Sequence, residues 1–159
     1  MDTQILVGFL LTILPIFELR GGLPVIVEYT SRNGISIWPY FFIVLALNIL
    51  VIFLIFMFFD FLHKSLMGWK AYRRAIGTIL TRIQKKVEKV QNGISRWGFL
   101  ALMCFVAIPL PGTGAWTGTL VAWTLGLNRW KSFIAIASGV IIAGFLVLLA
   151  SLGFFSGFY

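Results

Sequence analysis

The sequence predicts an all-α polytopic membrane protein in which two inverted repeats are joined by a basic amphipathic cytoplasmic helix. Of 159 residues, 60% are hydrophobic and only 11% are charged, whereas soluble domains carry about 25% charged residues. Two apolar stretches are long enough to cross a bilayer, and two shorter ones are interrupted by proline and glycine. We expect one membrane domain, 1–159, with repeat one at 1–62, the basic helix at 63–96 and repeat two at 97–159.

The two long apolar stretches are residues 37–62 and 132–158. A spanning helix needs about 20 apolar residues, and both stretches meet that length. The first is uncharged until Asp60 near its end, which we expect at the inner interface. Gly139 and Gly144 in the second are typical of close helix packing. Each stretch therefore predicts one transmembrane helix.

The two shorter stretches predict re-entrant hairpins. The apolar stretch 5–17 is interrupted by Pro15 and then by a break at Glu18–Pro24. The apolar stretch 99–108 is followed by a break at Pro109–Gly114. Such a half-length helix can turn at mid-membrane and leave by the side it entered, since irregular backbone is tolerated there when protein or water surrounds it. We expect Glu18 and Thr113 to approach each other with non-helical backbone. Four conventional spans remain the alternative.

The order hairpin, span, basic segment, hairpin, span is a repeat. The sequence Gly34-Ile-Ser-Ile-Trp38 resembles Gly126-Leu-Asn-Arg-Trp130, which lies 92 residues further on. Only one span and one loop separate the two hairpins, so the hairpins should enter from opposite sides. This inverted-topology arrangement is common in secondary transporters.

Basic residues fix the expected orientation. The net charge is +8, and nine of the 13 Lys and Arg residues fall between Lys64 and Arg96. The positive-inside rule makes 64–96 cytoplasmic and puts both termini outside the cell membrane. Apolar residues at helical spacing within 76–94 predict an amphipathic helix that lies on the membrane lipids, or that forms a gate or a homodimer seam. Because the charge is clustered in a loop, no nucleic-acid partner is predicted.

Glu18 and Arg20, followed by Gly21 and Gly22, are the candidate binding or coupling residues of the first break. Ionisable groups at membrane depth are costly and indicate function by default. The planar fork of Arg20 suits a phosphate or a carboxylate, and burial favours a protonated carboxyl group, so Glu18 can carry a coupling proton. The structural alternative is an ion pair between the two side chains.

The second break offers glycines for close backbone approach, threonine hydroxyls, and N–H groups that can cradle an anion. Its candidate residues are Pro109, Pro111, Gly112, Thr113, Gly114 and Thr117. The alternative is a tight turn packed on the first hairpin. With one cysteine and one histidine, the chain predicts no metal site; it shows no cofactor motif, and no nucleophile–base pair of an enzyme.

The stretches Pro15-Ile-Phe-Glu-Leu-Arg-Gly-Gly-Leu-Pro24 and Phe105-Val-Ala-Ile-Pro-Leu-Pro-Gly-Thr-Gly-Ala-Trp-Thr-Gly118 resemble the small multidrug export protein family over nearly the whole chain. That family is more distantly similar to DedA-like membrane proteins. The resemblance implies proton-dependent transport and flipping of polyprenyl-phosphate lipids, with Glu18 and Arg20 matching the acidic and basic features. The second hairpin departs, because no arginine lies between Arg96 and Arg129.

We therefore expect a transporter that moves an anionic amphiphile, such as a polyprenyl-phosphate lipid, across the bilayer with proton coupling. Two alternatives stay open. In a cationic-drug exporter, Glu18 would hold the substrate charge. In a non-transporting membrane scaffold, the hairpins would bind a partner protein.

Overall fold

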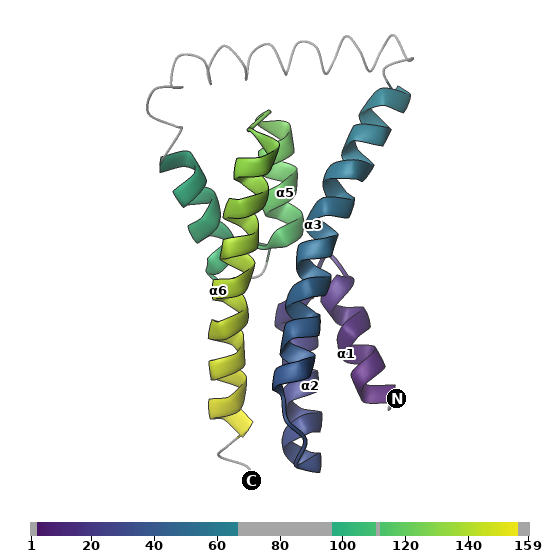
Figure 1. Cartoon of the computed structure of the whole chain (residues 1–159), viewed down its shortest axis with the longest axis vertical. Helices are drawn as coiled ribbons and strands as arrows, with labels where there is room; N and C mark the ends of the chain where they lie inside the picture. Colours follow the sequence, from purple (N-terminus) through teal and green to yellow (C-terminus); the bar gives the residue numbers. More distant parts are fainter. Residues whose placement is uncertain (1–2, 67–96, 111, 156–159) are drawn as a thin grey trace.

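The computed structural model describes residues 3–66, 97–110 and 112–155, which contain six helices and no strand (Figure 1). The all-α prediction is confirmed for these residues. The predicted basic helix lies outside them from residue 67 to 96, as does Pro111. The helices are α1 (Thr3–Ile13), α2 (Glu18–Asn33), α3 (Trp38–Leu66), an unlabelled helix at Trp97–Ala107, α5 (Ala115–Thr124) and α6 (Arg129–Phe155).

The helices α3 and α6 contain the two membrane-length segments. By length and composition, Trp38–Leu62 and Arg129–Phe155 can each cross a bilayer, which confirms two long apolar helices to within a few residues of the predicted bounds. Large apolar side chains remain exposed along both helices, among them Phe42, Phe58 and Leu149. An exposed apolar surface of this kind is typical of contact with lipid or protein rather than water. These helices fit a membrane location.

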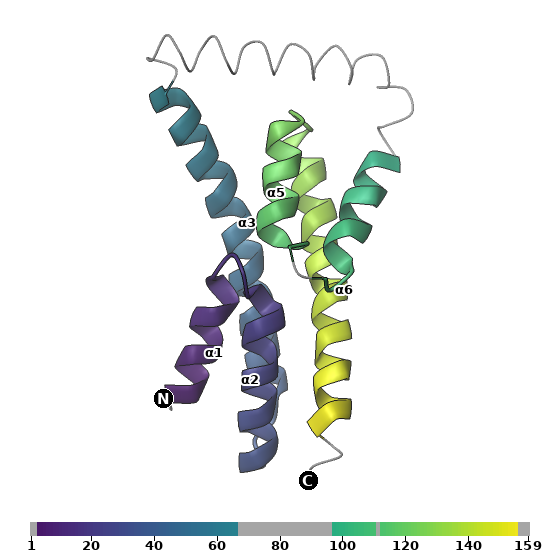
Figure 2. The same ribbon diagram turned by 180° about the vertical axis from the view of Figure 1, so that it is seen from behind.

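Two shorter helix pairs flank the long helices. In Figures 1 and 2, α1 and α2 form a hairpin at the end of the molecule where both termini lie. The helix Trp97–Ala107 and α5 form a second hairpin toward the opposite end, and both breaks lie at about mid-height of α3 and α6. Entry of the hairpins into a bilayer from opposite sides, and hence the inverted repeat, stays a prediction.

The first break lies at the predicted Pro15, but it does not continue through Glu18–Pro24, so the non-helical backbone expected at Glu18 is wrong. The chain turns at residues 14–17, and Glu18, with φ of 49°, is already the first residue of α2, which continues through Pro24. A proline inside a helix leaves one carbonyl without its donor, and here that carbonyl belongs to Arg20. Gly22 serves packing, because a Cβ atom there would overlap the Gly8 carbonyl of α1.

The second break agrees with the prediction. The α5 helix begins only at Ala115, so the described part of Pro109–Gly114 is non-helical, and Gly112 has a φ of 82° that favours glycine. The two glycines that the predicted repeat aligns, Gly34 and Gly126, both adopt left-handed conformations, with φ of 64° and 63°, and lie one and two residues after the ends of α2 and α5.

Glycines of α6 bring the second hairpin and α3 against this helix. A Cβ atom at Gly139 would lie 2.7 Å from the Met103 carbonyl oxygen, and one at Gly144 would lie 2.8 Å from the Leu45 side chain. The interpretation of both glycines as packing points is confirmed. The hairpins are therefore held against α6 and α3 with their breaks close together.

Candidate functional site

Glu18 of the first hairpin binds the start of α5 in the second. The residue is 6% exposed, and its carboxylate accepts hydrogen bonds from the backbone N–H groups of Ala115, at 3.2 Å, and Trp116, at 3.0 Å. The first N–H groups of a helix have no partner within it and carry a partial positive charge. Glu18 therefore caps α5 from the other hairpin.

Gly114 makes this approach possible. Its φ of 170° is extended and open to any residue, but a Cβ atom there would overlap both carboxylate oxygens of Glu18. The predicted close approach at this glycine is thus present. The group that approaches Gly114 is the Glu18 carboxylate of the same chain.

Arg20 binds the opposite end of the same break. Its guanidinium donates to the carbonyl oxygens of Val106, at 3.3 Å, and Ile108, at 3.2 Å, and also to that of Leu110. These carbonyls lie at and just beyond the C-terminal end of the Trp97–Ala107 helix, where the helix dipole is negative. No ion pair joins Glu18 and Arg20 in the described structure, so the alternative of a structural ion pair is wrong.

The second hairpin and α3 in turn donate hydrogen bonds to the last carbonyl groups of α1 in the first hairpin. The indole Nε1 of Trp116 donates to the carbonyl of Ile13, the last residue of α1, at 3.2 Å. The buried Asn48 of α3 reaches the Thr12 carbonyl at 3.4 Å. Away from water, each unsatisfied backbone group would cost several kcal/mol. No local sequence signal identifies Trp116 or Asn48 as site residues, because their partners are distant in the chain.

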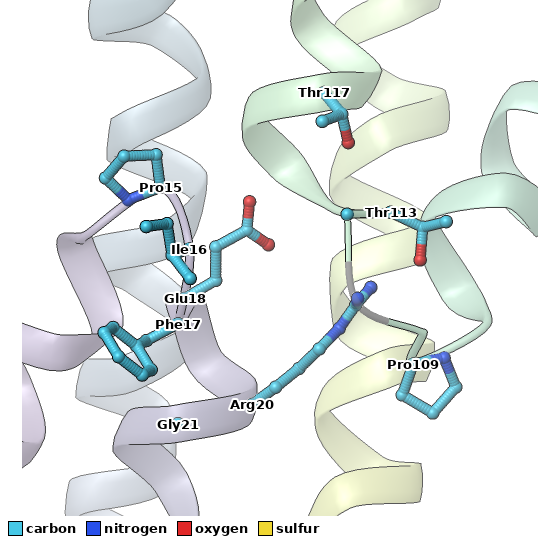
Figure 3. Close-up of a pocket in the computed structure, with 10 residues that line it drawn as sticks. Pro15, Ile16, Phe17, Glu18, Arg20, Gly21, Pro109, Thr113 and Thr117 are labelled. Atoms are coloured by element: carbon cyan, nitrogen blue, oxygen red, sulfur yellow. The ribbon is translucent and has the colours of Figure 1, made fainter.

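A cavity of about 260 Å³ lies where the two breaks meet, and Figure 3 shows the side chains of Glu18 and Arg20 extending from α2 toward it. It gathers seven of the ten predicted site residues: Glu18, Arg20, Gly21, Pro109, Gly112, Thr113 and Thr117, together with Pro15, Ile16 and Phe17. Gly22 and Gly114 contact other parts of the protein, and Pro111 lies outside the described residues.

The two threonines of the cavity bind their own turn. The Thr113 hydroxyl donates to the Ile108 carbonyl at 2.8 Å, and the Thr117 hydroxyl oxygen accepts from the Gly114 N–H at 2.9 Å. These bonds fit the alternative of a tight turn packed on the first hairpin. By contrast, the buried Nε of Arg20 has no partner among the described residues. Arg20 is thus the side chain with donor capacity left over.

In the described residues, two membrane-length helices are flanked by helices that are broken at a shared polar site, which fits a small helical membrane protein with interrupted helices. Such breaks form the binding sites of many secondary transporters. The family model described as "Putative small multi-drug export protein" matches residues 18–146, and the chain belongs to this family. No curated protein and no solved structure matches the chain. The similarity to DedA-like proteins stays an expectation.

Proposed function

We propose that this protein exports an anionic amphiphile, such as a lipid with a phosphate head, and that the head binds in the 260 Å³ cavity where the two breaks meet. One observation carries the proposal: Arg20 lines this cavity and also a second one of about 480 Å³. The second cavity is bordered by Pro24, Pro109 and the apolar C-terminal part of α6, including Leu146 and Phe154. A charged head and an apolar tail would each find a matching surface at Arg20.

Cavity size supports this division. Pockets that enclose a whole drug-sized ligand measure about 300–1,000 Å³, so a cavity of about 260 Å³ suits a head group rather than a complete amphiphile. The tail would extend into the 480 Å³ cavity beside α6. The charged guanidinium of Arg20, which lines both cavities, would supply a charge-assisted donor for a phosphate oxygen.

The same contacts support the proposal of proton coupling through Glu18. A protonated carboxyl group is a weaker acceptor than a carboxylate, so protonation would loosen its bonds to Ala115 and Trp116. The freed start of α5 is a site that favours anions. Proton and anion would therefore bind cooperatively, and by linkage each would strengthen the other. Export would carry both together.

A flux assay in proteoliposomes tests the proposal, with a fluorescent lipid phosphate and a cationic dye as the two substrates. Arg20→Ala should reduce lipid-phosphate flux at least tenfold, since a charge-assisted bond is lost, while Arg20→Lys keeps the charge but not the fork and should fall between. Glu18→Gln should remove the pH dependence of flux. Thermal unfolding of each variant in detergent identifies losses that are due to misfolding.

Three results would contradict the proposal in different ways. If Arg20→Ala leaves lipid-phosphate flux intact, the anion site is elsewhere. If the wild type moves only the cationic dye and Glu18→Gln stops it, the protein is a cationic-drug exporter. If folded wild type moves neither substrate, the scaffold alternative is favoured, with the hairpins as the surface for a partner protein.

A further inference from the structure

A third cavity, of about 310 Å³, lies between the C-terminal part of α3 and the start of α6. It shares no lining residue with the cavity at the hairpin tips, and the two helix ends that form it lie at the end of the molecule opposite both termini (Figure 1). Aromatic and apolar side chains form most of its wall, and an ion pair closes one side. The lining residues are Phe53, Phe56, Met57, Asp60, Arg129, Trp130 and Phe133.

The ion pair joins Asp60 and Arg129 across the two helices. Both guanidinium Nη atoms donate to the carboxylate, one of them at 2.7 Å, and the Trp123 indole adds a third bond at 3.3 Å. Asp60 is therefore bound within the protein instead of standing free at an interface. The sequence held a signal for this pair, because a lone acid ends one span and a base begins the other.

The unused hydrogen-bonding capacity of the pair belongs to Arg129. A guanidinium has five N–H donors, and Arg129 commits two of them to Asp60 while 63% of its side chain stays exposed. The Asp60 carboxylate, with three donors already in place, is 25% exposed. A ligand that accepts hydrogen bonds thus finds free donors on Arg129, whereas a ligand that donates them finds little acceptor capacity left on Asp60.

Charge around the cavity also favours an anion. In the described stretches 60–66, 97–103 and 124–134, Asp60 is the only acidic residue, whereas Lys64, Arg129 and Lys131 are basic. Arg129 begins α6, and the N-terminal end of a helix carries partial positive charge. The polar side of the cavity therefore suits a phosphate.

The remaining wall suits an acyl chain. Phe53 and Met57 are more than half exposed beside the cavity, and Trp130 is 76% exposed. These side chains continue the apolar surfaces of α3 and α6, which are the helices long enough to cross a membrane. A lipid beside these helices could place its chain on the aromatic wall and its phosphate at Arg129 without leaving the bilayer.

We propose that this α3–α6 groove is a binding site for an anionic phospholipid, with the phosphate on Arg129 and one acyl chain along Phe53, Phe56 and Phe133. The site does not depend on transport at the hairpin tips. Asp60 competes with the lipid for Arg129 and so sets the affinity. Removing the acid and removing the base should consequently have opposite effects.

Tryptophan quenching tests the site in the purified full chain in detergent. Phosphatidylglycerol or phosphatidylcholine with brominated acyl chains is titrated, and the signal of Trp130 is obtained as the difference from Trp130→Phe. Half-maximal quenching should need roughly tenfold less phosphatidylglycerol than phosphatidylcholine, as expected for a charge-assisted contact. Inorganic phosphate alone should not displace the lipid, because it makes no contact with the apolar wall.

Variants separate the proposed contact from a structural role. Arg129→Gln should abolish the preference for phosphatidylglycerol, whereas Asp60→Asn should increase it severalfold while keeping an acceptor for Trp123. Arg32→Gln is the matched control, because Arg32 forms an exposed ion pair with Glu28, at 2.8 Å, within α2.

Equal quenching by the two lipids would overturn the proposal, as would displacement by inorganic phosphate. A loss of preference in Asp60→Asn would also overturn it. Since Asp60→Asn leaves Arg129 intact, it decides the question even where Arg129→Gln does not fold.

Discussion

Replacing Gly114 with alanine tests the contact between the two hairpins most directly. The added methyl group would overlap both carboxylate oxygens of Glu18, so the carboxylate must leave the N–H groups of Ala115 and Trp116. A hydrogen bond to a charged group contributes about 1.5–3 kcal/mol. Two such bonds, taken at the lower value, give a loss of about 3 kcal/mol. Glu18 is only 6% exposed, so water replaces these bonds only in part.

The assay is thermal unfolding of the purified protein in detergent at a fixed heating rate. For a chain of this size, 1 kcal/mol corresponds to about 2–4 °C in Tm, so Gly114→Ala should unfold about 6–12 °C below the wild type. Gly153→Ala in α6 is the control. A Cβ atom there meets nothing within 4 Å, and alanine is the better helix former, so Tm should not fall.

A double-mutant cycle identifies the cause of the loss. In a Glu18→Ala background no carboxylate remains to collide with, so Gly114→Ala should have almost no further effect, and the coupling should approach the full 3 kcal/mol or so. An equal loss of Tm in both backgrounds would refute the assignment of Glu18 as the cap of α5.

The remaining predictions concern packing, capping and topology. Gly22→Ala should force α1 and α2 apart and cost about 1–3 kcal/mol, measured by the same unfolding assay; an unchanged Tm would contradict the close approach of the two helices. Trp116→Phe keeps an aromatic ring but loses the bond to the Ile13 carbonyl, so it should cost about 1 kcal/mol, and no loss would argue against the reciprocal cap. In a chain without its native cysteine, a cysteine at the exposed position Asn33 should react with impermeant reagents from outside and one at Asn128 should not; the reverse pattern would overturn the orientation.

Composition and length were sufficient to predict the two long helices, because roughly 20 consecutive apolar residues leave little choice of structure. The position of the first break was predictable from Pro15, but its extent was not. Gly-Gly-Leu-Pro is a local signal for a break, yet Gly22 is occupied with packing against α1. Tertiary contact therefore overrode local propensity, and the break is confined to residues 14–17.

The candidate site was predictable in its charged residues and not in their partners. Glu18 and Arg20 stand out because charges are rare in apolar segments. Their partners are backbone groups 86 to 98 residues away, and a backbone group has no residue-type signature. For the same reason, the sequence predicted that Glu18 and Arg20 contact a ligand or each other. In the structure both side chains instead bind backbone groups at helix ends. The cavity beside them could be seen only once both breaks were placed.

The separation in sequence between the hairpin tips also affects how the protein is made. Chain synthesis proceeds at about 5–20 residues per second, so Glu18 and Arg20 exist for several seconds before the backbone groups that bind them are made. During that interval a carboxylate and a guanidinium stand near the end of a short apolar helix without their final partners. A charged group is costly inside hydrocarbon, so the first hairpin should stay near water or lipid head groups until the second arrives. Final insertion of the first hairpin would then wait for the second, and a ribosome stalled before residue 106 should leave Glu18 accessible to water-soluble reagents.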